Sequence, residues 1–542
     1  MDFGDALMAS KTRTFFVNGI TLTLTALAMR LVSVIFNVYV SNRAGSEAMG
    51  LFSLLGSVYA LAITAATAGI NLGTTRLVSD ALGLGDTALA KRSVRRCLLY
   101  CTLTGGAVSL LLFSLAEPIA RVILTDARAI PSLRCLAITL VPIAICSALG
   151  GYFTAVRRVK VHAASGIAAQ FIKIGATMML MTSFTTGTPE NMCVLLVLGG
   201  AVAEVFSLAV TFTLYLFDVK LKLKPTSVKS AEPIVKKLLG ITLPVTFSAC
   251  IRSALSTFQH VLVPRGIHKS GKSWSAALSS YGALHGMALP LLLFPSAIIY
   301  SFAGLLIPEI SECCVKNDTQ RMKRSCYRAL TMSMFFSIGV SGIMLFFSNE
   351  LGTLIYNNSE TALYIRVLAP LIPVMYVDGM VDAVLKGSGH QVYSMNVNIV
   401  DTLTACVFAL TLIPRLGIWG YVISIYATEI LNTTLSLIKM ISVSGIKPRV
   451  FHQIIMPILC IIGATQGARL VLRFVPIVPG QAIGLILSII ISLAIYIGLL
   501  YVTKAIGKDE FELLNASLLT EKQYERKFSA QREQLLTEGN NT

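Results

Sequence analysis

Three basic side chains lie near the middle of long apolar stretches of the chain: Arg30, Lys173 and Arg252. A charge of this kind costs about 2.5–3.5 kcal/mol when it faces lipid, so we expect all three to face buried partners or a wet cavity. Two guanidinium groups at one cavity suit a multiply charged anion, because each binds phosphate oxygens in a bidentate manner. The candidate substrate-binding residues are Arg30, Arg252, Lys173 and His285.

A second polar group, Asn398, Asp401 and Thr402, follows a helical spacing. Side chains three and four residues apart lie on one face of a helix, and their oxygens can bind a coupling Na⁺ or H⁺. The alternative interpretation of these three residues is a local polar network. The alternative interpretation of the buried charges in general is that each base pairs with an acid on another helix. No metal site and no other cofactor is expected. The acids available for such pairing are Glu204, Asp378, Asp382, Asp401 and Glu429.

The chain lacks the motifs that mark common catalytic sites. It has no Walker A sequence, no HExxH, no GxSxG and no Cys/His set with zinc spacing. Its 11 cysteines include no CxxC pair, so we interpret most of them as buried apolar side chains. We therefore expect no enzyme, and the energy for transport has to come from an ion gradient, the membrane potential or removal of the substrate elsewhere.

These side chains must be positioned by helices in a membrane. Of the 542 residues, 55% are hydrophobic and 13% are charged, about half the charged fraction of ~25% in soluble domains. With a mean hydropathy of +0.74, the chain cannot cover a water-facing surface. The formal charge of +18 lies in short clusters between apolar stretches, not on one face as in a nucleic-acid binder. Soluble enzymes, secreted scaffolds and disordered regulators are excluded.

About fourteen stretches reach the ~20 apolar residues of a spanning helix. Basic residues gather in alternate loops, including positions 91–96 and 220–237. Because such loops stay inside the cell, we predict a multi-pass protein of the cytoplasmic membrane with both termini cytoplasmic. The predicted helix centres are Leu27, Tyr59, Val108, Ala144, Phe171, Ala203, Ala249, Leu289, Phe336, Met375, Cys406, Ile425, Ile461 and Ile491.

The chain also matches itself when it is shifted by about 221–232 residues. Arg30 aligns with Arg252, and Lys173 aligns with the opposite charge of Asp401. Each copy holds six helices, an even number, so the copies share one orientation in the membrane. The predicted all-α organisation is an N-terminal six-helix lobe at 1–217, a basic cytoplasmic linker at 218–238, a C-terminal six-helix lobe at 239–440, a helix pair at 451–503 and a polar cytoplasmic tail at 504–542.

Four segments resemble a known group. They are GLFSLLGSVYALAITAATAGINLGTTRLVSD from Gly50, YGALHGMALPLLLFPSAIIYSFAGLLIPEISE from Tyr281, VDAVLKGSGH from Val381 and GYVISIYATEILN from Gly420. The chain is similar to the multidrug/oligosaccharidyl-lipid/polysaccharide flippase superfamily, in its stage V sporulation protein B and polysaccharide-transporter branch. The resemblance implies alternating access around a cationic cavity for a polyprenyl-pyrophosphate sugar. It also implies a cation on the first helix, where Arg30 lies, and one on the eighth, where this chain has His285.

From these observations we expect a transporter that flips a lipid-linked oligosaccharide or peptidoglycan precursor across the membrane. The expected partners are the lipid-linked sugar and the bilayer, with no nucleic acid, and the sequence does not indicate an oligomeric state. One alternative is a cation-coupled multidrug exporter of the same superfamily. The other is a non-transporting membrane scaffold in envelope or spore-coat assembly, with fully paired charges and a dry interior.

Overall fold

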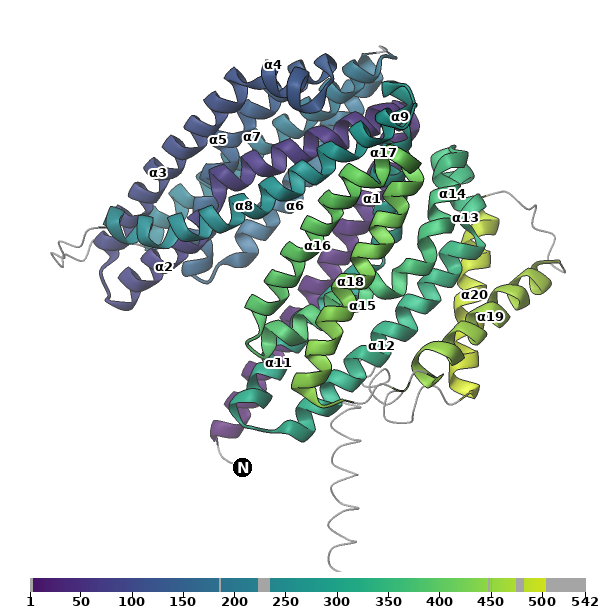
Figure 1. Cartoon of the computed structure of the whole chain (residues 1–542). Helices are drawn as coiled ribbons and strands as arrows, with labels where there is room; N and C mark the ends of the chain where they lie inside the picture. The colour runs from purple at the N-terminus through teal and green to yellow at the C-terminus, as the bar shows by residue number, and fades with distance from the viewer. Residues whose placement is uncertain are drawn as a thin grey trace, which may run out of the picture. The chain divides into compact units, whose positions relative to one another are not determined.

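The computed structural model describes residues 3–184, 187–222, 234–446, 449, 451–473 and 482–503. Within these ranges every regular element is a helix (Figure 1), as expected where lipid leaves no partner for an open strand edge. Fourteen described stretches are long and apolar enough to cross a membrane, which confirms the predicted fold class. The tail at 504–542 and most of the linker at 218–238 lie outside the described residues.

The first helical stretch crosses the membrane twice. The span Leu27–Gly83 has 57 residues, about 85 Å of helix, nearly three times the ~30 Å of a hydrocarbon core. Within it, α1 (Phe3–Thr67) is interrupted at Gly45, whose φ of 79° and ψ of 169° are not helical. A glycine adopts this backbone without steric cost. The helices predicted around Leu27 and Tyr59 therefore meet at Gly45.

Two helical stretches are interrupted within or beside their apolar segments. The chain between α1 and α2 (Ile70–Gly83) breaks at Gly69, whose φ is 76°. The chain between α10 (Leu289–Leu293) and α11 (Ser296–Val315) breaks at Pro295, which has no N–H to donate. The sequence predicts one helix centred on Leu289, which the structure divides into the spans Trp274–Leu293 and Ser296–Val315. Conversely, the two helices predicted around Leu27 and Tyr59 form the single span Leu27–Gly83, so the total is again fourteen.

The sequence repeat is visible in the backbone. The helices α3 (Thr87–Ser114) and α12 (Thr319–Phe346) each have 28 residues, and each begins with an aspartate that accepts a hydrogen bond from the third backbone N–H. In addition, three residues with positive φ in the first half have counterparts with positive φ in the second, all at the same spacing. L-residues rarely adopt this conformation, so both halves follow one backbone plan. The pairs are Gly85 and Asn317, Thr125 and Asn357, and Arg157 and Gly389.

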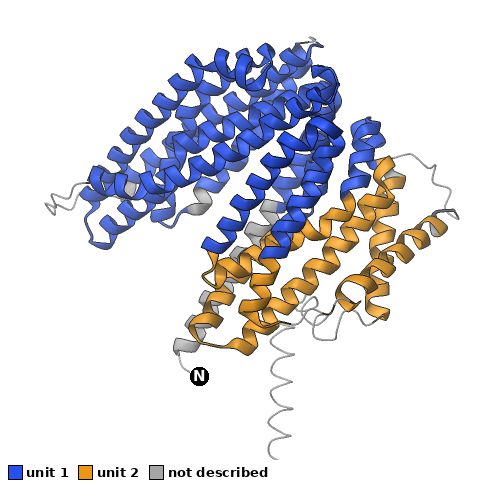
Figure 2. Ribbon diagram, in the orientation of Figure 1, with its two compact units in different colours: residues 1–298, 351–368, 392–435 blue, residues 299–350, 369–391, 436–542 orange. Residues whose placement is uncertain are grey.

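Unit 1 comprises residues 1–298, 351–368 and 392–435 (Figure 2). Small residues bring its helices into backbone contact, as is common in membranes. A Cβ on Gly282 would lie 1.9 Å from the carbonyl oxygen of Ser46, and one on Gly50 would lie 2.1 Å from that of Leu278. Its further elements are α4 (Ala116–Pro118), η1 (Ile119–Leu124), η2 (Ala127–Ala129), α5 (Ile130–Ala155), α6 (Val159–Ser183), α7 (Pro189–Lys222), α8 (Ile234–Lys269), α9 (Trp274–Tyr281), η3 (Gly282–Ala288), η4 (Leu351–Ile355), α14 (Ser359–Leu368), α16 (Gln391–Thr411), α17 (Ile413–Leu416) and most of α18 (Ile418–Ser444).

Unit 2 comprises residues 299–350, 369–391 and 436–542. The C-terminal helix pair packs on α12: the Tyr496 hydroxyl donates to the carbonyl of Phe335 at 2.8 Å, and Gln453 donates to the Thr331 hydroxyl at 2.7 Å. The division into lobes at 1–217 and 239–440 stays a prediction, because units of contact need not coincide with units of sequence repetition. Besides most of α11, all of α12 and the end of α18, unit 2 holds α13 (Ser348–Glu350), η5 (Ala369–Leu371), α15 (Ile372–Gly387), η6 (Phe451–Ile455), α19 (Met456–Arg473) and α20 (Ala482–Val502).

Candidate functional site

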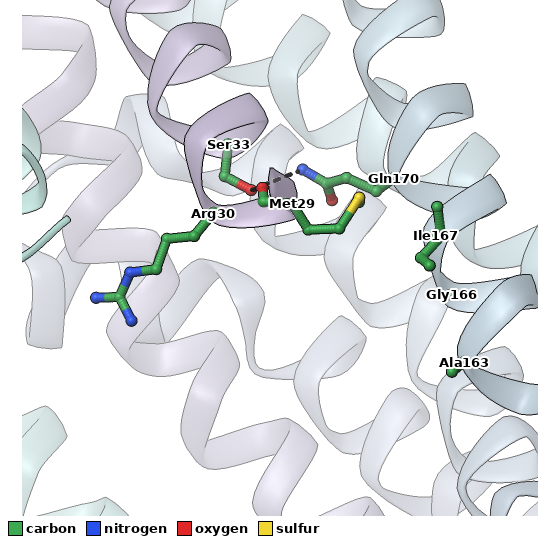
Figure 3. Close-up of a pocket in the computed structure, with 7 residues that line it drawn as sticks. All are labelled: Met29, Arg30, Ser33, Ala163, Gly166, Ile167 and Gln170. Atoms are coloured by element: carbon green, nitrogen blue, oxygen red, sulfur yellow. Dashed lines mark hydrogen bonds between the residues drawn. The ribbon is translucent and has the colours of Figure 1, made fainter. Parts of the chain in front are cut away.

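Arg30 lies at a cavity between the first helix and α6. The cavity has a volume of about 550 Å³. Gln170 of α6 donates to the Ser33 hydroxyl across it, at 3.3 Å. Figure 3 shows that the Arg30 side chain extends away from the α6 residues. We call this space the Arg30 cavity; it is lined by Met29, Arg30, Ser33, Ala163, Gly166, Ile167 and Gln170.

The Arg30 guanidinium reaches the break between α10 and α11. These two elements belong to the helix predicted around Leu289, which is the eighth in the predicted topology. Its Nη2 donates to the carbonyl oxygen of Leu293 at 3.1 Å, and the Ser296 hydroxyl donates to the same oxygen at 2.6 Å. The usual helical donor is absent there, since the Ala297 N–H bonds to Phe294 instead. Arg30 thus stabilises the break through a neutral acceptor, and no ion pair to a carboxylate is found for it among the described residues. Its charge remains available to an anion.

Arg252, the repeat partner of Arg30, is exposed on α8. Within the described part of the chain it makes no hydrogen bond and no ion pair. An arginine at the centre of a membrane helix faces a wet or protein-lined space, because the lipid alternative is costly. That both arginines face one shared cavity stays a prediction.

Lys173 lies in a different environment. It is half-buried on α6, near Glu204 of α7, and the two opposite charges are close enough to interact. Lys173 follows Gln170 by one helical turn but does not line the Arg30 cavity. The structure brings Lys173 together with an acid, in line with the pairing alternative, and its role in binding substrate stays a prediction.

His285 belongs to a second cavity, of about 260 Å³. Its ring stacks on the Tyr281 ring at 5.1 Å and meets the His260 ring edge-on at 4.7 Å. The Tyr281 hydroxyl lies 3.2 Å from Nδ1 of His260, and the Tyr421 hydroxyl lies 3.4 Å from Nδ1 of His285. These contacts fix both imidazoles at the cavity wall. We call this space the hydroxyl pocket; it is lined by Ser53, Gly56, Ser57, Ala60, Ser253, Ser256, Thr257, His260 and His285.

Sequence reasoning missed His260 and the hydroxyl groups around it. A signal was present, because Ser253, Ser256, Thr257 and His260 follow the spacing of one helix face. A stripe of small hydroxyl side chains carries no charge, however, and gives a weaker signal in a membrane helix than an arginine does.

The proposed ion-coupling residues share one face of α16. Asn398 donates to the backbone carbonyl of Ser394, and Thr402 donates to that of Asn398, both at 2.8 Å. Asp401 has one buried carboxylate oxygen with no hydrogen-bond partner among the described residues. The side-chain oxygens of all three can still bind a cation, and the Asp401 carboxylate can also accept a proton. Ion coupling stays a prediction, and no cluster of three or more His, Cys, Asp or Glu that could hold a metal ion occurs in the described ranges.

A separate charged network surrounds Arg128, which lies in η2. Arg128 is paired with Glu47 and with Asp126, at 2.8 Å in each case, and the Trp274 indole donates to Asp126 at 2.9 Å. Burial raises the pKa of Asp126, but the hydrogen bonds from Arg128 and Trp274 outweigh burial, and the pKa is lowered overall. We call this group the Arg128 network. It links the part of α1 just after Gly45, the turn at η2 and the start of α9 within unit 1.

A membrane protein whose described elements are all helical, with one backbone plan repeated in its two halves and with cations inside its membrane helices, has the features of a transporter. Comparison with known proteins gives the family. The family model described as MatE matches residues 22–179 and 276–411, more than half of the chain. The chain belongs to the MatE family and is a transporter of the multidrug/oligosaccharidyl-lipid/polysaccharide superfamily, not a member of an enzyme family.

Individual relatives cover most of the chain. It is 28% identical to stage V sporulation protein B of Bacillus subtilis (strain 168), over 92% of this chain and 97% of the relative. Among solved structures it matches the lipid II flippase MurJ in an inward closed conformation, with a TM-score of 0.65, 13% identity and coverage of 89% and 99%. It also matches an inward-facing multidrug resistance MATE transporter, with a TM-score of 0.59, 15% identity and coverage of 77% and 95%. These likenesses confirm the resemblance inferred from sequence.

Proposed function

We propose that this transporter flips a lipid-linked oligosaccharide or peptidoglycan precursor, a polyprenyl-pyrophosphate sugar, across the cytoplasmic membrane. The two lobes alternate access to the headgroup while the polyprenyl tail stays in lipid, and both termini lie in the cytoplasm. Support comes from the sporulation relative that spans nearly the whole chain and from the similarity in fold to a lipid II flippase.

One observation carries the proposal: two arginines at the centres of membrane helices have no carboxylate partner among the described residues. Arg30 donates only to the carbonyl of Leu293, and Arg252 is exposed. Guanidinium groups kept in a membrane without an acid are costly unless an anion joins them. Pyrophosphate has the charge and the oxygen geometry that guanidinium prefers.

The remaining candidate residues take supporting roles. Lys173 adds positive charge to the N-terminal lobe, and His285 contacts the headgroup from the eighth helix. Asn398, Asp401 and Thr402 hold a coupling Na⁺ or H⁺. An inside-negative potential also helps, since moving one negative charge outward through 100 mV releases about 2.3 kcal/mol.

The test is a flipping assay with purified protein in liposomes. The substrate is a polyprenyl-pyrophosphate sugar labelled on the sugar, and its exposure on each leaflet is measured over time. We expect Arg30→Ala and Arg252→Ala to abolish flipping with normal insertion. The matched control is Arg134→Ala, an arginine that stacks on Phe113 at 5.6 Å, and it flips normally. Undiminished flipping in both test variants would remove the assigned site.

A multidrug exporter is the alternative function, because one solved protein of similar fold is a multidrug resistance MATE family transporter. The same liposomes separate this alternative: inhibition by organic cations, and not by pyrophosphate lipid, identifies a drug exporter. Single cysteines placed beside Arg30 and Arg252 separate the scaffold alternative. Accessibility that alternates between the two sides indicates transport, and protection throughout indicates a scaffold.

A further inference from the structure

The hydroxyl pocket has a chemistry unlike that of the Arg30 cavity. Seven of its lining residues carry a hydroxyl or an imidazole, and none carries a lysine, arginine or carboxylate side chain. Hydroxyl and neutral imidazole groups can donate and accept hydrogen bonds alike. A ligand for such a wall is uncharged and carries several hydroxyl groups of its own.

Several of these groups are free to bind a ligand. The hydroxyls of Ser53 and Ser256 make no hydrogen bond with any described residue, yet neither belongs to the buried atoms without a partner. They therefore face the open space of the pocket. Thr257 donates to the backbone carbonyl of Ser57 at 2.8 Å, which leaves its oxygen as an acceptor. The pocket offers both donors and acceptors at once.

The pocket is connected to Arg252 along α8, and along the eighth helix to the Leu293 oxygen that binds Arg30. On α8, Ser256 follows Arg252 by four residues, so the two share one face. His260 follows Arg252 by eight residues, which is about 12 Å along the helix axis. On the eighth helix, Leu293, which binds Arg30, follows His285 by eight residues, again about 12 Å of helix or slightly less. Asn37 donates to the carbonyl of Gly286 at 3.3 Å, so the first helix runs antiparallel beside this segment.

The first helix, α8 and the eighth helix all place the arginine site on the same side of the hydroxyl pocket. In the predicted topology the first helix and α8 run outward, and the eighth helix runs inward. Arg30, Arg252 and Leu293 therefore all lie on the cytoplasmic side of the two histidines. A headgroup that enters from the cytoplasm with its sugar leading meets the hydroxyl pocket when its pyrophosphate reaches the arginines.

We propose that the hydroxyl pocket is a sugar subsite: Ser53, Ser253, Ser256, Thr257 and His260 bind the first sugar of the lipid-linked substrate while Arg30 and Arg252 hold its pyrophosphate. The inference rests on the proposed function and deepens it. The volume of about 260 Å³ equals roughly nine waters at ~30 Å³ each, which is room for one sugar ring. An organic cation finds no carboxylate among the lining residues.

The test compares two ligands that differ only in the sugar. Binding to the purified full-length protein is measured for a polyprenyl-pyrophosphate sugar and for the same polyprenyl pyrophosphate without sugar. The double variant Ser253→Ala/Ser256→Ala is expected to bind the sugar-bearing lipid about ten-fold more weakly, since two hydrogen bonds are lost, and to bind the sugarless lipid normally. Ser256→Leu, which fills the pocket, gives the same selective loss by another route.

Two further variants make the outcomes separable. Ser114→Ala, at an exposed serine of α3 whose hydroxyl donates to the Leu110 carbonyl, leaves both affinities unchanged. Arg30→Ala weakens the binding of both lipids by the same factor. Equal losses for both lipids in the serine variants, or no loss for either, overturn the sugar subsite while the arginine site stands. If the unaltered protein binds neither lipid, the proposed function fails, and the subsite fails with it.

Discussion

Arg128 and the pair Arg30 and Arg252 are the same residue type in opposite surroundings. Arg128 is held by two carboxylates and lies beside a tryptophan that binds one of them. Arg30 contacts only a backbone carbonyl, and Arg252 is exposed. An arginine saturated by acids has a settled geometry and stabilises the fold. An arginine without them costs stability, and under the proposed function the phosphates of the substrate offset that cost.

The largest expected effect comes from reversing a ligand-binding charge. Arg252→Glu replaces attraction to phosphate by repulsion, and close charge pairs in binding sites are worth about 2–5 kcal/mol. Affinity for the pyrophosphate lipid therefore falls by about 100-fold or more. Because Arg252 has no described partner, the melting temperature stays unchanged. A large loss of stability with intact binding would show that Arg252, like Arg128, has a structural role and does not bind the lipid.

The reverse pattern is expected for Arg128. Arg128→Ala leaves the carboxylates of Glu47 and Asp126 without their cation, which costs about 2 kcal/mol for this partly exposed group. Thermal unfolding in detergent measures the loss. Affinity for the pyrophosphate lipid should remain within about twofold, since surface changes far from a site are usually small. Arg121→Ala, whose pairing with Glu117 is exposed, is the matched control.

Lys173 lies between the two cases, because it has an acid nearby without a tight ion pair. A double-mutant cycle with Lys173→Met and Glu204→Gln measures their coupling, which we expect to be about 0.5–1 kcal/mol. A coupling of this size makes Lys173 partly structural. No coupling, together with loss of flipping in Lys173→Met alone, would assign Lys173 to the substrate.

The smallest effect concerns pH. The pKa of Asp126 is lowered in the folded protein, so its contribution to stability is present above the unfolded value near 4 and is lost as pH falls through the lower folded value. Unfolding followed between about pH 6 and pH 3 should show this loss in the unaltered protein and a flatter profile in Asp126→Asn. Identical profiles would mean that Asp126 does not titrate with folding.

Much of the fold follows from the sequence, because apolar stretches near 20 residues have few alternatives in a membrane. The fourteen spans, the repeat and the break near Pro295 all had a local signal. The division into contact units had none, since it depends on how distant helices pack.

The candidate site was predictable only in part. A charge such as Arg30 or Arg252 is conspicuous in an apolar helix, so sequence reasoning found it. The pairing of Lys173 with Glu204 and the cluster of His260 with His285 join residues far apart in the chain, and helix register alone does not determine such contacts. The Arg128 network was missed because its four members come from three separate segments.

The interruption at Phe294–Pro295 has a mechanical consequence. At this joint the Ala297 N–H bonds to the Phe294 oxygen, and Pro295 has no N–H to donate, so fewer main-chain bonds hold the backbone here than in a continuous helix. Arg30 supplies one of the two donors that hold the Leu293 oxygen. Under the proposed function, a phosphate that draws the guanidinium to itself leaves the Leu293 oxygen with the Ser296 hydroxyl as its remaining side-chain donor.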